Sequence, residues 1–84
     1  MSESNSIIIT RKVYGKIKLK LREYLDARGM NRNQLARAAQ ANFAVIDKWY
    51  NGKVEKLDLD VLARICYVLD CEVSDLLVYE KTEA

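Results

Sequence analysis

The sequence contains no histidine and no proline, and it has only three glycines and two cysteines. Without histidine, Cys66 and Cys71 cannot complete a zinc site of the usual kind, because two thiols five positions apart lack further soft ligands. No glycine-rich loop is present to hold a phosphate, and no nucleophile stands beside an evident base. We therefore expect no enzyme activity, no cofactor, no metal and no small-molecule substrate.

Turn residues are too few for a fold made of strands, because all-β proteins need many glycines and prolines in their turns. Hydrophobic residues make up 50% of the 84 positions, which favours a packed globule over disorder. The length fits one domain. The expected fold class is a compact all-α domain.

No hydrophobic run approaches the roughly 20 residues that a helix needs to cross a bilayer. The first six residues, MSESNS, also lack the basic start and apolar stretch of a signal peptide. We expect a cytoplasmic protein without membrane contact. In a reduced cytosol, Cys66 and Cys71 are expected to be small core residues, with a disulfide as the alternative.

The two signs of charge are distributed unevenly along the chain, although the net charge is only +2. Residues 11–56 contain twelve Lys or Arg against four acidic residues, and residues 57–84 contain two against seven. A basic half beside an acidic half suits a protein that meets a polyanion on one side. Ordinary solvated helix faces would give the same pattern.

Apolar spacing and turn residues divide the chain into a tail at 1–6, an extended arm or strand at 7–14, a domain at 15–79 and a frayed tail at 80–84. The first helix is predicted from about 17 to 28, where Gly29 ends it. Residues 16–21 alternate polar and apolar side chains, which is also the spacing of a strand.

Two short helices are predicted next. Asn31 is a suitable N-cap for a helix over 32–39, and Gln34 three positions later completes a capping box. A short turn follows, and Asn42 caps a helix that continues to Tyr50. The pair Asn51-Gly52 is a typical stop signal.

Two further helices complete the five-helix prediction. Asp58 caps a helix that ends near residue 69, with Leu59 as the first residue of its apolar stripe. Ser74 caps a short fifth helix, after which Val78 and Tyr79 can extend as a strand.

The second and third helices have the pattern of a helix-turn-helix unit, in which one helix stands clear enough to enter the DNA major groove. Small and apolar residues are expected on the inner side, and Asn42, Phe43, Ala44, Asp47 and Lys48 lie on the opposite side of the third helix. The segments that match a known family are Asn31-Arg32-Asn33-Gln34-Leu35-Ala36, Ile46, Trp49-Tyr50-Asn51-Gly52-Lys53, Leu62, Ile65-Cys66, Leu69-Asp70-Cys71 and Asp75-Leu76-Leu77. Across residues 17–77 the chain thus resembles the Cro and lambda-repressor type of helix-turn-helix domain.

The resemblance implies a five-helix fold and a DNA-binding regulator of transcription, most often a dimeric repressor or activator. It implies phosphate contacts by Arg32, Asn42, Asn51 and Lys53, and base contacts at Asn42, Phe43, Ala44 and Lys48. The residues themselves add Lys56 as a phosphate-binding cation and Asp47 as an acceptor for cytosine N4. The expected partner is double-stranded DNA.

Three positions differ from the family's usual pattern. Phe43 and Ala44 stand where polar residues are usual, and Gln40 stands in the turn where glycine is common. Apolar residues at the start of the third helix also suit a protein-interaction module, such as an antitoxin or adaptor that uses this helix against another protein. That module is the alternative to a DNA-binding regulator.

A homodimer is expected because one small domain covers little DNA surface. Two copies about 34 Å apart would contact half-sites one helical turn apart. The β-prone segments at 7–14 and 77–79 are candidates for pairing within or between subunits.

Overall fold

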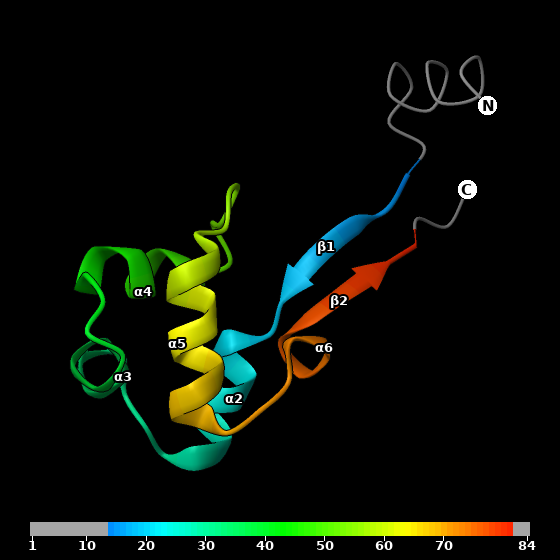
Figure 1. The fold of residues 1–84 in the computed structure, drawn as a ribbon. Helices are drawn as coiled ribbons and strands as arrows, with labels where there is room; N and C mark the ends of the chain where they lie inside the picture. The colour runs from blue at the N-terminus through cyan, green and yellow to red at the C-terminus, as the bar shows by residue number, and fades with distance from the viewer. Residues whose placement is uncertain (1–13, 82–84) are drawn as a thin grey trace.

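A computed structural model describes residues 14–81, which form five helices and a two-stranded antiparallel sheet (Figure 1). The expected helices are present, but the fold is not purely all-α because the sheet joins the two ends of the described chain. In chain order the elements are β1 Lys16–Leu19, α2 Leu21–Arg28, α3 Arg32–Ala38, α4 Phe43–Tyr50, α5 Leu59–Leu69, α6 Val73–Leu76 and β2 Leu77–Glu80.

The first helix begins later than the sequence predicts. Residues 16–19 form β1, and α2 starts only at Leu21. The alternating pattern there belongs to a strand because the chain returns after α6 and pairs with it, in a register from Lys16 opposite Glu80 to Leu19 opposite Leu77. The extension predicted at Val78 and Tyr79 is confirmed as part of β2. Residues 7–13 of the predicted arm lie outside the described chain.

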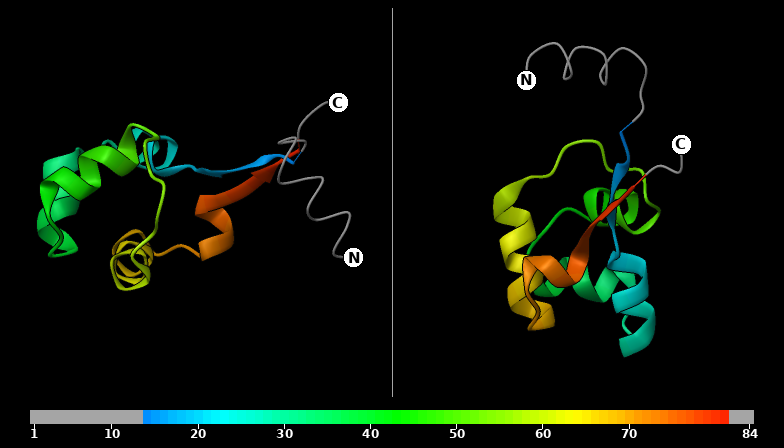
Figure 2. Two further views of the ribbon diagram at one scale, coloured as in Figure 1. Left: turned by 90° about the horizontal axis from the view of Figure 1, so that it is seen from above. Right: turned by 90° about the vertical axis from the view of Figure 1, so that its right-hand side faces the viewer.

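The sheet forms a narrow ribbon that projects away from the helices (Figures 1 and 2). At the outer end of the ribbon, Gly15 permits the close approach of the two strands, because a Cβ at this position would lie 1.8 Å from the carbonyl oxygen of Glu80. The Gly15 backbone N–H donates to the Tyr79 hydroxyl at 2.9 Å. The ribbon reaches one residue beyond the predicted domain end at 79.

One hydrophobic core unites the helices and the inner end of the ribbon. Its buried members are Leu19, Leu21, Leu25, Leu35, Ala36, Ala39, Ile46, Trp49, Leu62, Ile65, Leu69 and Leu76. The prediction for Leu59 was wrong, since this side chain is 76% exposed. The buried positions of α5 begin one turn later, at Leu62, so the Leu59 side chain lies outside the core.

The predicted N-caps are confirmed for three helices. The Asn31 side chain accepts from the Gln34 N–H at 2.8 Å and the Gln34 side chain accepts from the Asn31 N–H, also at 2.8 Å. Asn42 and Asp58 cap α4 and α5. The predicted cap Ser74 was wrong, because α6 starts two residues earlier, after Glu72.

Both cysteines are free and half-buried. Burial, with a smaller contribution from neighbouring Cys66, raises the pKa of the Cys71 thiol to about 11. The thiol at position 71 is therefore uncharged at neutral pH, as expected of a packing residue. Among residues 14–81, no helix has the length and apolar character to cross a membrane.

Candidate nucleic-acid interface

Helices α3 and α4 form the helix-turn-helix pair, and each contributes one face to the core. Leu35 and Ala36 are buried on α3, and Ile46 and Trp49 are buried on α4. The two buried residues of α4 are three positions apart, so they share one side of the helix. The opposite side of α4 is left open to solvent.

The turn between the two helices has a left-handed residue at Gln40, with φ of 51°. The Ala41 N–H donates to the Ala36 carbonyl at 2.9 Å, and the Gln40 N–H donates to the Arg37 carbonyl at 3.2 Å. These two bonds make a Schellman motif, in which the left-handed position favours glycine. Glutamine therefore adopts here a conformation that strains an L-amino acid.

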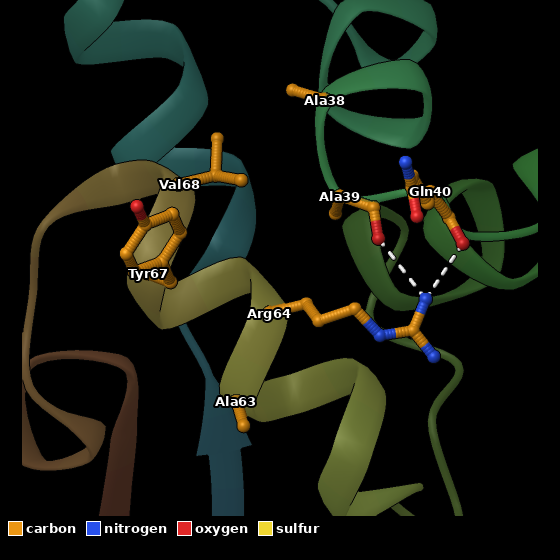
Figure 3. Close-up of a pocket in the computed structure, with 7 residues that line it drawn as sticks. All are labelled: Ala38, Ala39, Gln40, Ala63, Arg64, Tyr67 and Val68. Carbon is orange, nitrogen blue, oxygen red and sulfur yellow. Dashed lines mark hydrogen bonds between the residues drawn. The ribbon is translucent and has the colours of Figure 1, made fainter.

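Arg64 of α5 holds this turn from outside the pair (Figure 3). Its Nη1 donates to the carbonyl oxygens of Ala39 at 3.1 Å and Gln40 at 2.6 Å, while Nη2 donates to Asp60 at 2.6 Å. The guanidinium thus satisfies carbonyls at the end of α3 that no helical N–H can reach. This contact ties α5 to the turn between α3 and α4.

Replacing Gln40 by glycine should raise the free energy of unfolding by about 0.5–1 kcal/mol. Relief of the left-handed strain is worth about 1–2 kcal/mol, and the greater freedom of glycine in the unfolded chain offsets part of that gain. Urea denaturation would measure the change. Ala38→Gly, two residues earlier in α3, is the matched control and should destabilise by about 1 kcal/mol. Equal losses for both variants would contradict this account of the turn.

The open side of α4 carries most of the residues predicted to contact bases. Phe43 is 43% exposed, and Ala44 and Lys48 are also exposed. Asn42 caps the helix, with its Oδ1 accepting from the Ala44 N–H at 2.7 Å. The structure therefore brings these four residues together on one accessible surface, which we call the α4 face.

Asp47 is a half-buried residue of α4 and is engaged by two neighbours. Arg32 Nη1 donates to its Oδ1 at 2.6 Å, so the first residue of α3 is linked to α4. Asn51 Nδ2 donates to the Asp47 backbone carbonyl at 2.9 Å and to Oδ1 at 3.3 Å. The carboxylate thereby orients two of the predicted phosphate-binding side chains.

Comparison with known proteins agrees with this geometry. The family model of the Cro/C1-type HTH DNA-binding domain matches residues 20–82. The chain belongs to this family. Among solved structures, it is similar to the crystal structure of transcriptional regulator VanUg, Form II, with 25% identity and a TM-score of 0.62 over 81% of this chain and 91% of that one. No curated protein matches the sequence.

The loop after α4 in this Cro/C1-type domain carries the remaining predicted phosphate contacts. Gly52, with φ of 73°, ends α4, and the Lys53 N–H donates to the Lys48 carbonyl at 3.0 Å. Lys53 and Lys56 are both exposed. The loop therefore places two cations just past the end of the helix that carries the α4 face.

One feature of this Cro/C1-type domain was missed in the sequence. Arg22 of α2 and Arg32 of α3 both stack on the Tyr50 ring, with their Cζ atoms 4.9 and 4.8 Å from its centroid. The Tyr50 hydroxyl donates to Asp26 Oδ1 at 2.8 Å. Interaction with Tyr50 raises the pKa of Arg22 above its ordinary value. Arg22 and Tyr50 are 28 positions apart, so no local spacing could have indicated the contact.

Proposed function

We propose that this protein is a sequence-specific regulator of transcription, acting as a repressor, that inserts α4 into the major groove of double-stranded DNA. The observation that supports this most strongly is the α4 face, where Asn42, Phe43, Ala44 and Lys48 are exposed. The other side of the same helix is anchored by Ile46 and Trp49. An anchored helix with an open outer face suits a groove about 12 Å wide.

Within the proposed complex, three residues of the α4 face contact base edges. The Lys48 ammonium is a donor for guanine O6 or N7. Phe43 and Ala44 offer apolar contact to thymine methyl groups. We predicted a base contact for Asp47 as well, but its bonds to Arg32 and Asn51 favour a role in orienting those two side chains.

The proposed backbone contacts surround the α4 face. Arg32 and Asn51 flank it, Asn42 presents the first N–H groups of α4, and Lys53 and Lys56 follow its last turn. Contacts with phosphates set the position of the protein on the duplex and carry no sequence information directly.

Lys48→Ala and Lys53→Ala separate the two kinds of contact. Both remove one exposed lysine charge. Loss of a base contact at Lys48 should reduce affinity for the preferred duplex about 5- to 100-fold, and affinity for a scrambled duplex much less. Loss of a phosphate contact at Lys53 should weaken both duplexes alike.

Fluorescence anisotropy on a preferred duplex, first selected from random sequences, and on its scrambled counterpart measures both effects. Equal losses on the two duplexes for both variants would reject base reading by Lys48. Absence of duplex binding by the wild-type protein, even at low salt, would reject the proposed function as a whole.

We also propose that the protein binds DNA as a homodimer formed through the β1–β2 ribbon. Ile17 and Tyr79 face each other across the two strands and are 62% and 53% exposed, respectively. An exposed apolar pair on a projecting ribbon suits a second copy of the same ribbon.

Ile17→Glu should convert the dimer to a monomer, because two copies would then bury like charges against each other. Light scattering after size-exclusion chromatography measures the mass. Val73→Glu is the matched control, since Val73 is an exposed apolar residue on α6, at 48%. A dimer that survives Ile17→Glu would exclude the ribbon face as the interface.

The exposed Phe43 supports a second candidate function, in which the α4 face docks on another protein. Binding of that kind depends on apolar contact and not on counterion release. Its salt dependence should therefore be slight, whereas DNA binding through several phosphates is strongly salt-dependent.

A further inference from the structure

A cleft of about 390 Å³ lies beside the last turn of α4. One wall comes from β1 and the start of α2, and the other comes from the end of α4 and the residues that follow it. The polar groups and backbone that line it include Lys16, Lys18, Arg22, Tyr50, Asn51 and Gly52. The cleft is continuous with the proposed DNA interface because Asn51 belongs to both.

Arg22 gives this cleft a positive charge that takes part in no direct ion pair within residues 14–81. Lys18 pairs with Glu23 at 3.2 Å, and Lys16 lies 4.0 Å from Glu80. Within residues 14–81, Arg22 has no carboxylate oxygen within 4 Å of its guanidinium. The two acidic residues of the cleft are thus paired with lysines, and Asp26 and Glu23 act on the Arg22 charge only at longer range.

The Arg22 side chain is also held in place before any ligand binds. Its Cζ lies 4.9 Å from the centre of the Tyr50 ring, and the ring is fixed by the bond from its hydroxyl to Asp26. Stacking of a guanidinium on an aromatic face is favourable and restricts a long, flexible side chain. A restrained side chain loses less conformational entropy when it binds.

We propose that this cleft binds a phosphodiester group of the DNA backbone, with Arg22 as its cation and Tyr50 as the residue that positions Arg22. The proposal rests on the DNA-binding function proposed above and adds a contact from α2, outside the helix-turn-helix pair. A guanidinium presents paired N–H donors that match two phosphate oxygens. The Asn51 side chain borders the same cleft and extends the contact toward the α4 face.

Arg22→Ala tests the contact, and Arg28→Ala is its matched control. Both arginines are exposed residues of α2 that stack on a tyrosine, since Arg28 Cζ lies 5.7 Å from the Tyr24 ring centre. Arg22→Ala should weaken binding to preferred and scrambled duplexes alike, by about 3- to 10-fold. It should also reduce the slope of log K against log salt by about 0.9 per bound copy. Arg28→Ala should leave the slope unchanged.

The positioning role of Tyr50 is tested by combining substitutions. Tyr50→Phe keeps the ring, so Arg22→Ala should cost the same in that background as in the wild type. Tyr50→Leu removes the ring, so Arg22→Ala should then change the salt slope and the affinity less. Circular dichroism of each variant verifies that the helices are intact.

Three outcomes are distinguishable. A wild-type protein that binds no duplex overturns the proposed function and this site with it. Wild-type binding with an unchanged salt slope in Arg22→Ala, or the same change in Arg28→Ala, overturns the cleft alone. If Arg22→Ala changes the salt slope and the affinity equally in the Tyr50→Phe and Tyr50→Leu backgrounds, the positioning role of Tyr50 is overturned.

Discussion

Raising the salt concentration from about 50 to about 200 mM is expected to weaken DNA binding by at least about 1,000-fold. Apart from Arg22 of the cleft, Arg32, Lys53 and Lys56 supply three proposed phosphate-binding cations in each copy, so a dimer would displace about six counterions from the duplex through these three. Each contributes about −0.9 to the slope of log K against log salt, which gives a slope near −5 from these three cations and near −7 when the Arg22 contact is included. Anisotropy titrations at several salt concentrations measure it.

The same titration separates the competing assemblies. A monomer should show a slope near −3 from the three cations, and near −4 when the Arg22 contact is included. Lys53→Ala should reduce the magnitude of the slope by about 0.9 for each copy bound. A slope near zero for the wild-type protein would be incompatible with phosphate contacts by these side chains. It would favour the protein-docking alternative.

Trp49→Ala is expected to destabilise the protein by about 3–5 kcal/mol. Phe43→Ala, at an exposed position of the same helix, is expected to destabilise it by less than about 1 kcal/mol. Trp49 is 4% exposed and belongs to the hydrophobic core, whereas Phe43 is 43% exposed. Loss of a buried aromatic side chain removes its transfer free energy and leaves a cavity. Domains of this kind have about 5–15 kcal/mol of stability in total, so the tryptophan variant should be near the limit of folding.

Thermal denaturation followed by circular dichroism compares the two variants. Each kcal/mol corresponds to about 4–8 °C in a domain of this size, so Trp49→Ala should lower Tm by more than about 12 °C. Phe43→Ala should lower Tm by less than about 8 °C and should still reduce DNA affinity. The opposite assignment, with Phe43→Ala unfolding the protein, would mean that the inner and outer sides of α4 are exchanged.

Local signals in the sequence were sufficient to predict the helix-turn-helix pair. Asn31 with Gln34 and Asn42 mark the starts of α3 and α4 through bonds that span only two or three residues. The positions of Ile46 and Trp49 indicate which side of α4 is buried. Caps and apolar periodicity act within one or two turns, so the sequence displays them directly.

The features that escaped prediction depend on contacts between distant segments. β1 is a strand because residues near position 80 return to pair with it, and its alternating pattern was compatible with the start of a helix. The bond between Arg32 and Asp47 joins two different helices, as does the stacking of Arg22 on Tyr50. Which charged side chains of different helices come into contact depends on how the helices pack, and not on the spacing of the residues in the sequence.

The central claim is that the outer surface of α4 lies in the major groove, and intermolecular nuclear Overhauser effects in a protein–DNA complex test it most directly. Thymine methyl groups are exposed in that groove and have no counterpart in the minor groove. We predict cross-peaks from the Ala44 methyl and the Phe43 ring to these methyl groups. A bound complex in which both side chains contact only sugar protons, or no DNA protons, would contradict the account.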